Sequence, residues 1–524
     1  MGKIVYPIPA RYRIIYTTLV TEIAIQPTRP PRAGSSVAEK SKIAQFPSEP
    51  LALKPAFLWS AVAVATFHLT YTTPYFALLT IVYVFALLQL MRARTGRQSF
   101  YLSLGAGMLI AAPQLSCFWT LFGPSAIALW LILAFWTALF VTLGRFCLIS
   151  LGVFRGALLL PFLWTGLEYF RSELYYLRFS WLNIGYAYSA STYAKILSLF
   201  GMYGIGFITL AIVGGFWLLG LKRGMIITGA VLLVFLWYLM GPNAIIKPGK
   251  PVQVAGVQLE FPTEHEVLRA LDQLIEAKPE TQIIVLCEYA FLSPIPDNVK
   301  SWCKEHQRYL IAGGKDSFLG SPARAASDPP LPDNFYDTAF VVGTNGDIVF
   351  KQGKSVPVQF LKDGLPAKEQ KLWESPWGKI GICICYDLSY TRVTDRLVHL
   401  GAQAMVIPTM DVVNWGRHEH ELHARVARVR AAEYGIPVFR VASSGISQLV
   451  DRSGVERASA GFPGQNEMVS GTMYIGRAGW LPIDRWLAPA AVGVSGLVIL
   501  FLVGRRVFFS LQRSNGSTIQ QTPS

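Results

Sequence analysis

The chain has 524 residues, of which 52% are hydrophobic and only 15% are charged. Soluble proteins usually carry about 25% charged residues, so this composition excludes a wholly soluble protein. The net charge is +15, but the cations lie mainly between apolar segments and form no basic face with interleaved aromatic residues, which argues against a nucleic-acid partner.

The N-terminal part of the chain predicts a membrane protein. Residues 1–55 lack the apolar core of a cleaved signal peptide, so we expect a flexible cytoplasmic N-terminus. Apolar segments follow throughout 56–241, and one more lies at 487–506. Most have the length of about 17–25 residues that a bilayer-spanning helix needs. About eight transmembrane helices are therefore expected, near 56–73, 74–91, 100–117, 124–143, 150–170, 196–220, 224–241 and 487–504.

The loop charges predict the orientation of these helices. Basic residues follow every second apolar segment, at Arg92, Arg145, Lys222 and Arg505. Because basic loops stay in the cytoplasm, residues 242–486 are expected on the outer, periplasmic face, and 507–524 form a cytoplasmic tail. Arg155 falls inside the fifth segment, so either that span begins after it or its side chain faces the bundle.

Residues 242–486 have a different pattern, in which short runs rich in Val and Ile alternate with polar stretches. Helices are expected at 263–277 and 417–434. Strands that are apolar almost throughout are typical of sheets buried on both faces. The pattern predicts a layered α/β domain with buried sheets.

Three residues with catalytic potential stand at strand ends in this domain. Glu288 closes QIIVLCE, Lys354 follows GDIVFKQ, and Cys385 lies inside KIGICICYD. A thiol needs a base to take its proton and a cation to favour the thiolate and stabilise an oxyanion, so this trio suits acyl transfer. Lys351 follows the same strand and competes for the cationic role, but the spacing from Gly346 favours Lys354.

The other cysteines and the histidines have simpler interpretations. Cys287 and Cys383 read as small buried hydrophobes, and Cys383 and Cys385 are expected to lie on one strand without a disulfide between them. RHEHELH offers His418, His420 and His423, but their helical spacing does not suit a metal, so we expect a solvated helix face. The sequence predicts neither a metal nor a cofactor.

The order and context of the strand-end residues resemble the nitrilase superfamily, which has a strand-terminal Glu, a Lys after GDIVFKQ, GICICYD and RAAEYGIPVFRVASSG in this order. The resemblance implies a four-layer αββα fold and a catalytic triad of Glu288, Lys354 and Cys385. Within that superfamily, spans on both sides of an outer nitrilase-like domain resemble the apolipoprotein N-acyltransferases. LPFLWTGLEYFRSE and FSWLNIGYAYS are similar to signatures in the membrane half of that family.

This resemblance implies a ping-pong reaction in the bacterial inner membrane. Cys385 would take an acyl chain from a phospholipid as a thioester and pass it to the α-amino group of a lipoprotein's diacylglyceryl cysteine. Glu288 would act as base and then acid, and Lys354 would stabilise the oxyanion. Tethering of the outer domain at both ends is compatible with a monomer.

Further residues are expected to support the triad, namely Tyr386, Asp387, Trp415, Arg430 and Glu433. Asp387 stands where the family commonly has Glu and is expected to fix Lys354. Arg430 and Glu433 are three apart on a helix, so they form either an ordinary surface pair or a brace for the site.

The sequence also departs from the family pattern. The acid of the family's Val-Pro-Phe-Gly-Glu run is missing, because KSVPVQFLKDG has Gln359 and Phe360 near that place, and TMDVVNWG replaces Ser-Asn-Asp-x-Trp-Phe-Gly. The exposed-looking Phe360, Leu361 and Leu365 either cap the domain's core or form an arm over a lipid entrance. Two other functions remain open: hydrolysis of a small periplasmic amide by the same triad, and an inactive scaffold.

Overall fold

The structure is a computed structural model, and it describes residues 46, 49–240, 249–316 and 335–517. The expected cytoplasmic N-terminus lies mostly outside these residues, as does the end of the expected C-terminal tail. Every described residue belongs to one compact unit, Ala44–Ser524.

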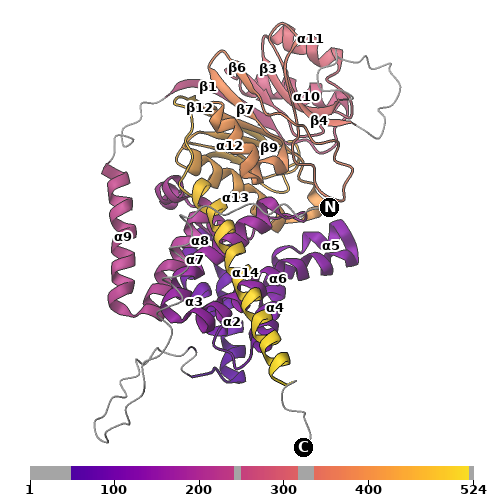
Figure 1. Ribbon diagram of the computed structural model, residues 1–524. Coiled ribbons are helices and arrows are strands. Elements are labelled where there is room, and N and C mark those ends of the chain that lie inside the picture. Colours follow the sequence, from indigo (N-terminus) through magenta and orange to yellow (C-terminus); the bar gives the residue numbers. More distant parts are fainter. Residues whose placement is uncertain (1–45, 47–48, 241–248, 317–334, 518–524) are drawn as a thin grey trace, which may run out of the picture. The chain divides into compact units, whose positions relative to one another are not determined.

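The membrane half is a bundle of helices (Figure 1). Each apolar segment expected from the sequence is helical. The helices are α2 (Leu53–Thr72), η3 (Pro74–Leu79) with α3 (Thr80–Leu90), α4 (Gly96–Gln114), α5 (Cys117–Phe122), α6 (Ala126–Leu151), α7 (Val153–Tyr169), α8 (Ala194–Leu219), α9 (Leu221–Met240) and α14 (Asp484–Ser517). Arg155 is exposed near the start of α7, so its side chain does not face the bundle.

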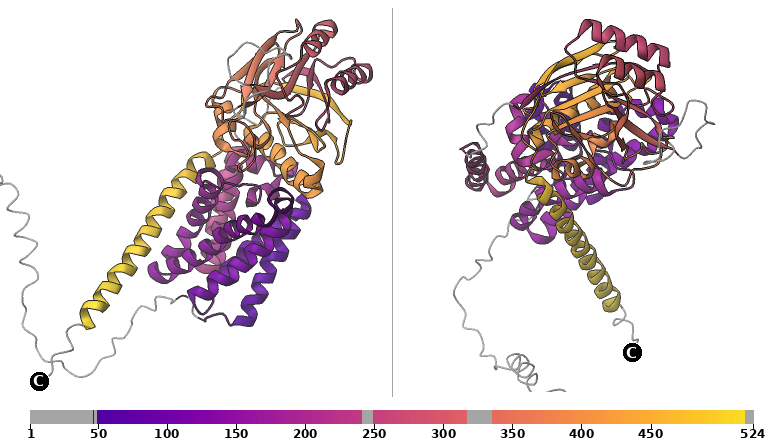
Figure 2. Two further views of the ribbon diagram at one scale, coloured as in Figure 1. Left: turned by 90° about the vertical axis from the view of Figure 1, so that its right-hand side faces the viewer. Right: turned by 90° about the horizontal axis from the view of Figure 1, so that it is seen from above.

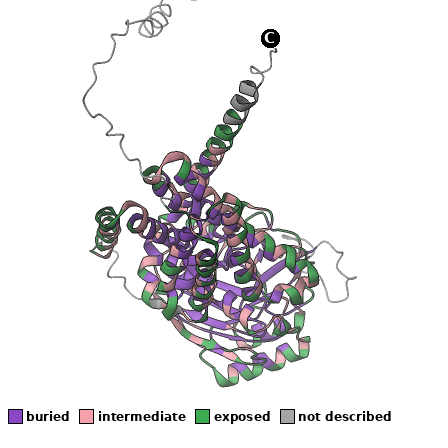
Figure 3. Ribbon diagram, turned by 90° about the horizontal axis from the view of Figure 1, so that it is seen from below, coloured by how far each residue is buried: buried purple, intermediate pink, exposed green. Residues whose placement is uncertain are grey.

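Apolar surface and helix length both suit a lipid environment. Among the described residues, four helical stretches are long and apolar enough to cross a membrane: Cys117–Leu151, Ala194–Leu219, Leu221–Met240 and Asp484–Phe508. Exposed segments run along α9 and α14 (Figure 3), where large apolar side chains such as Trp237 and Leu500 face outward. Large exposed apolar surfaces of this kind mark contact with a partner or a lipid phase.

The second half of the unit holds two six-stranded sheets, with strand orders β12-β1-β2-β3-β4-β5 and β11-β10-β9-β8-β7-β6. The first sheet comprises β1 (Lys250–Val257), β2 (Ile283–Val285), β3 (Tyr309–Asp316), β4 (Tyr336–Val342), β5 (Ile348–Gly353) and β12 (Met468–Ile475). The second comprises β6 (Leu372–Ser375), β7 (Gly378–Ile382), β8 (Ala404–Thr409), β9 (Val438–Ala442), β10 (Ser447–Val450) and β11 (Glu456–Ala460).

Helices cover the outer faces of both sheets (Figures 1 and 2). On β2, Ile283 and Val285 point into the core between the sheets, whereas Ile284 packs with α10 (Glu264–Ala277) and α11 (Asp297–His306). Successive residues of a strand face opposite sides, so the sheet is buried on both faces. On the other side, α12 (Thr391–His399) and α13 (Arg417–Tyr434) share a core with the bundle. This is the layered α/β domain that the sequence predicts.

The domain contacts the bundle where α13 meets a break in α8. Gly201 interrupts α8 with φ of 72°, and a side chain there would collide with the Asp484 carboxylate. The break frees backbone N–H groups inside the protein, which must find acceptors. The Met202 N–H donates to Glu433 Oε1 at 2.7 Å, and the Tyr203 N–H donates to Asp484 Oδ2 at 2.9 Å. The two carboxylates therefore cap the second half of α8.

Two arginines balance these carboxylates. Arg430 Nη1 lies 2.6 Å from Glu433 Oε2, and Arg485 lies 3.1 Å from Glu433 and 2.7 Å from Asp484. We call Arg430, Glu433, Asp484 and Arg485 the joint. It ties α8, α13 and α14 together.

Candidate active site

The proposed nucleophile sits directly after a strand of the second sheet. β7 ends at Ile382, and Cys385 opens the short helix η9 (Cys385–Ser389) with φ of 49°. A positive φ is unfavourable for a residue with a side chain and is found mostly at functional sites and turns. The expectation that Cys383 and Cys385 share a strand is wrong, because the strand ends before both. Both are free and buried.

Asp387 fixes the turn that carries Cys385. Its carboxylate accepts hydrogen bonds from the N–H groups of Ser355 at 3.0 Å, Val356 at 2.7 Å and Ile384 at 3.3 Å. Asp387 is expected to fix Lys354, and its carboxylate holds the backbone that directly follows Lys354. Burial raises the pKa of Asp387 to about 6.

Glu288 and Lys354 meet in the interior of the domain. Lys354 Nζ donates to Glu288 Oε1 at 2.6 Å and lies 2.7 Å from Asp363 Oδ2 and 3.6 Å from Asp337 Oδ2. Glu288 Oε2 accepts a hydrogen bond from the Met410 N–H at 2.7 Å. We call Glu288, Asp337, Lys354 and Asp363 the lysine cluster. It places three carboxylates around one ammonium.

The charges of the lysine cluster set its protonation. Burial opposes the charge on Lys354, but Asp363 and Glu288 raise the pKa of its ammonium well above the usual value. Burial also opposes ionisation of Glu288, yet Lys354 holds the pKa of this carboxyl below its usual value. Burial and the neighbouring Glu288 raise the pKa of Asp337 well above the usual range. These shifts favour the ionised form of Glu288 and the protonated form of Asp337.

Cys385 is a protonated thiol beside this base. Burial and the Glu288 charge raise the pKa of the thiol well above its usual value. A hydrogen bond with Cys385 helps to keep the pKa of Glu288 low. The thiol also lies 3.7 Å from the Met410 carbonyl. An ionised carboxylate next to a thiol is the starting arrangement for general-base activation of a nucleophile.

Two members of the lysine cluster escape the sequence analysis. Asp363 lies in the KSVPVQFLKDG segment and supplies a carboxylate where the family's acid is missing. The Tyr289 hydroxyl at 2.9 Å and the Val358 N–H at 2.6 Å donate to it. Asp337 is a buried acid within the apolar strand β4, and that unusual position is its only signal in the sequence. Lys351 lies apart from the cluster and pairs with Asp316 at 2.8 Å.

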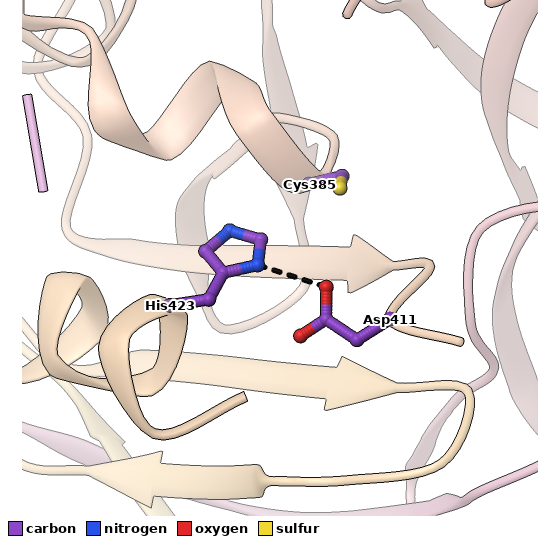
Figure 4. Close-up of side chains that lie close together, drawn as sticks. All are labelled: Cys385, Asp411 and His423. Carbon is purple, nitrogen blue, oxygen red and sulfur yellow. Dashed lines mark hydrogen bonds and ion pairs between the residues drawn. The ribbon is translucent and has the colours of Figure 1, made fainter. Parts of the chain in front are cut away.

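A second group of titratable side chains lies close to the nucleophile. One ligand-type atom each of Cys385, Asp411 and His423 lies within 4.8 Å of the others (Figure 4). His423 Nδ1 lies 2.8 Å from Asp411 Oδ1, and the Arg440 guanidinium bonds Asp411 Oδ2. The expectation of a solvated face is wrong for His420 and His423, which are both buried because α13 packs between the second sheet and the bundle.

Two clusters of the described residues have donor atoms that could surround a metal ion, Glu288 with Asp337 and Asp363, and Cys385 with Asp411 and His423. Each already has a cation among its side chains, because Lys354 pairs with the first and Arg440 with the second. These cations supply the charge that a metal would bring.

A largely apolar cavity of about 900 Å³, its open mouth included, leads from Cys385 to the bundle. Helices α5 and α6 contribute Phe118, Leu129 and Ile132, and Tyr386 and Trp415 also line it. Phe360 lies at the cavity with 65% of its surface exposed, and its ring is 6.1 Å from that of Phe122. The alternative in which Phe360 caps the domain's core is therefore wrong.

Arg430 connects the joint to the nucleophile's turn. Its Nε donates to the Leu388 carbonyl at 3.0 Å and its Nη2 to the Ser389 carbonyl at 2.8 Å. Arg430 and Glu433 are both fully buried, so the surface-pair alternative is wrong. Through these two hydrogen bonds, the pair supports the C-terminal end of η9.

Comparisons with known proteins agree with the resemblance found in the sequence. Residues 60–216 match the family described as the N-terminal domain of apolipoprotein N-acyltransferase, and residues 272–477 match carbon-nitrogen hydrolase. The chain is 25% identical over 381 residues to apolipoprotein N-acyltransferase of Shewanella oneidensis, covering 63% of this chain and 72% of that protein. It is 26% identical over 430 residues to that of Azotobacter vinelandii, covering 73% and 80%.

Solved structures also match part of the chain. A carbon-nitrogen hydrolase from Helicobacter pylori is 16% identical with a TM-score of 0.36, covering 43% of this chain and 90% of that chain. An amidase from Nesterenkonia sp. is 14% identical with a TM-score of 0.36, covering 44% and 93%.

Proposed function

We propose that this chain, an acyltransferase whose residues 60–216 and 272–477 match the N-terminal domain of apolipoprotein N-acyltransferase and carbon-nitrogen hydrolase, N-acylates lipoproteins with a phospholipid as the acyl donor. The observation that carries the proposal is the buried contact of Glu288 with Lys354 beside the Cys385 thiol. The acceptor is the α-amino group of a diacylglyceryl cysteine.

The first half-reaction loads the enzyme. Glu288 takes the thiol proton while Cys385 Sγ attacks the ester carbonyl carbon of the donor, and the Lys354 ammonium stabilises the resulting oxyanion. The carbon–oxygen bond then breaks, and Glu288 returns the proton to the departing lysophospholipid oxygen. The protonated thiol and ionised Glu288 of the resting site support this sequence.

The second half-reaction transfers the acyl group from the enzyme to the acceptor. The neutral acceptor amine attacks the thioester carbonyl carbon, Glu288 takes a proton from the nitrogen, and the proton passes to Sγ as the carbon–sulfur bond breaks. A thioester keeps the acyl group activated while the lipid partners exchange. The apolar cavity from Cys385 to α5 and α6 is a suitable place for the acyl chain.

Membrane placement is part of the same proposal. Helices within 56–241 and at 487–506 span the bacterial inner membrane, residues 242–486 form the periplasmic catalytic domain, and both ends of the chain are cytoplasmic. A membrane-embedded bundle next to Cys385 brings together two substrates that are both anchored in lipid.

The intact mass of the purified protein after exposure to phospholipid tests the mechanism. We expect an acyl adduct that hydroxylamine removes in the wild type and in Cys383→Ser. Cys385→Ser should show no adduct that hydroxylamine removes. Cys383 is a matched control because it is buried two residues before the nucleophile. Absence of an adduct from the wild type with every phospholipid tried would contradict the proposed donor.

A further inference from the structure

Glu419 is a buried carboxylate in the wall of the cavity that has no role in the mechanism so far. It lies in the first turn of α13, is 3% exposed, and lines the same cavity as Cys385, Asp411 and His423. Most other side chains around this space are apolar. A buried acid in such surroundings needs a partner or a proton.

The partners around Glu419 leave one oxygen unused. Oε2 makes no hydrogen bond within the described residues and lies 3.2 Å from His420 Nδ1, which is 2.9 Å from the Gly416 carbonyl. Oε1 lies 3.9 Å from His423 Nδ1. The neighbouring Asp411 is already matched by Arg440. Within the described part of the chain, the ion-pair contacts of Glu419 are therefore to two histidines alone, His420 and His423.

The position of the Glu419 carboxyl group relative to the nucleophile suits an acceptor group. Asp411 and His423 have atoms within 4.8 Å of a Cys385 atom, and Glu419 borders His423 on the cavity wall. Lys354 and Glu288 form a separate buried pair next to Cys385. A group that enters beside Glu419 would lie at the wall of the cavity that reaches Cys385.

We propose that Glu419 is the subsite for the primary ammonium of the acceptor, so that it recognises the free N-terminus and removes its first proton. This inference rests on the proposed function. Burial and the charge of Asp411 raise the pKa of Glu419 well above its usual value, which favours the neutral form of the side chain. An incoming ammonium stabilises the carboxylate, and the carboxyl proton leaves to solvent.

Proton transfer then completes the acceptor's activation. The Glu419 carboxylate takes one proton from the ammonium and becomes a carboxylic acid, which leaves a neutral amine with a free lone pair. That amine attacks the thioester carbonyl carbon. Its second proton goes to Glu288 and then to Sγ when the carbon–sulfur bond breaks.

The two half-reactions can be measured separately in the full-length protein in detergent micelles. Loading with phosphatidylglycerol, which has no amine, is followed by addition of a diacylglyceryl-cysteine peptide. For Glu419→Gln we expect unchanged loading and a KM for the peptide at least tenfold higher, with partial rescue in Glu419→Asp. Glu421→Gln is the matched control, because Glu421 lies two residues along α13 and its side chain is 43% exposed; it should behave as the wild type.

A binding measurement covers the case in which Glu419→Gln does not fold. In Cys385→Ala protein, the free-amine peptide should bind at least tenfold more tightly than its N-acetylated form. Equal binding of the two peptides, or a wild-type KM in folded Glu419→Gln, would overturn the proposal.

The donor's head group could carry the same ammonium, and loading distinguishes the two sources. Slower loading of Glu419→Gln from phosphatidylethanolamine but not from phosphatidylglycerol, with transfer unchanged, would assign the subsite to the donor and overturn the acceptor role. A wild-type protein that forms no thioester would contradict the proposed function, while the binding comparison would still decide the role of Glu419.

Discussion

The joint and the lysine cluster are both buried clusters of charged side chains, but they differ in charge balance. In the joint, Arg430 and Arg485 face Glu433 and Asp484, and Arg485 also pairs with Asp395 at 2.8 Å, so two cations meet three carboxylates. In the lysine cluster, three carboxylates surround the single ammonium of Lys354. The larger excess of carboxylates over cations in the lysine cluster favours the retention of a proton among its carboxyl groups.

The difference separates structural clusters from chemical ones in this molecule. The side chains of the joint form hydrogen bonds with backbone groups: Glu433 accepts one from α8, and Arg430 donates one to η9. The lysine cluster instead contacts a thiol, and its carboxyl groups have pKa values shifted in opposite directions, down for Glu288 and up for Asp337. Carboxyl groups whose pKa values are pushed apart are typical of acid–base sites.

Of the predicted effects, the largest is a loss of protein stability when the joint is broken. Glu433→Gln leaves two buried arginines with one carboxylate fewer, so we expect the free energy of unfolding to fall by about 3–5 kcal/mol. Thermal denaturation in detergent measures the loss. Glu421→Gln, an exposed substitution on the same helix, should change stability by less than about 0.5 kcal/mol. A Glu433→Gln protein as stable as the wild type would refute a structural role for the joint.

Reducing the excess charge of the lysine cluster should affect the chemistry more than the fold. Asp363→Asn removes a carboxylate that positions the Lys354 ammonium but leaves Glu288 in place. We expect thioester formation to slow about 10- to 100-fold, while the denaturation midpoint stays close to that of the wild type. Asp316→Asn removes the carboxylate that pairs with Lys351 and should leave the rate unchanged. A stability loss as large as that of Glu433→Gln would place Asp363 with the structural clusters.

The smallest predicted effect is a pH dependence of stability from Asp387. Burial raises the pKa of this carboxyl to about 6 in the folded protein, so the folded state binds its proton more tightly than the unfolded state does. The stability gained from this proton is lost as the pH rises through about 6. From pH 5 to pH 7, the wild type should lose about 1 kcal/mol relative to Asp387→Asn. A constant difference in unfolding free energy between the two proteins would contradict the shift.

The helices and strands can be predicted from the sequence because the local pattern of apolar and polar residues indicates them. The helix expected at 417–434 is α13 with the same bounds, and the Val- and Ile-rich runs contain strands of the two sheets. Strand ends also bring Glu288 and Lys354 into contact, as the α/β pattern suggests. The catalytic roles of these residues and of Cys385 remain predictions.

The rest of the site depends on contacts between distant segments. Asp363 reaches Lys354 from a loop that has no periodic pattern. The polar composition of α13 suggests a solvated face, but packing between a sheet and the bundle buries Glu419 and His423. Glu419 and His423 are four residues apart and so lie on one face of the helix. This spacing indicates that they share an environment, although the polar composition of the helix suggests that the environment is solvent.

The break in α8 has a consequence for the order in which the protein can assemble. The chain is synthesised from its N-terminus, so α8 and the whole hydrolase-like domain emerge before α14. Yet Asp484, which fills the space beside Gly201 and caps Tyr203, belongs to α14, as does the Arg485 that pairs with Glu433. Because α14 leaves the ribosome after α8 and the domain, it completes the contact between them, and until it inserts, the Tyr203 N–H lacks this carboxylate acceptor.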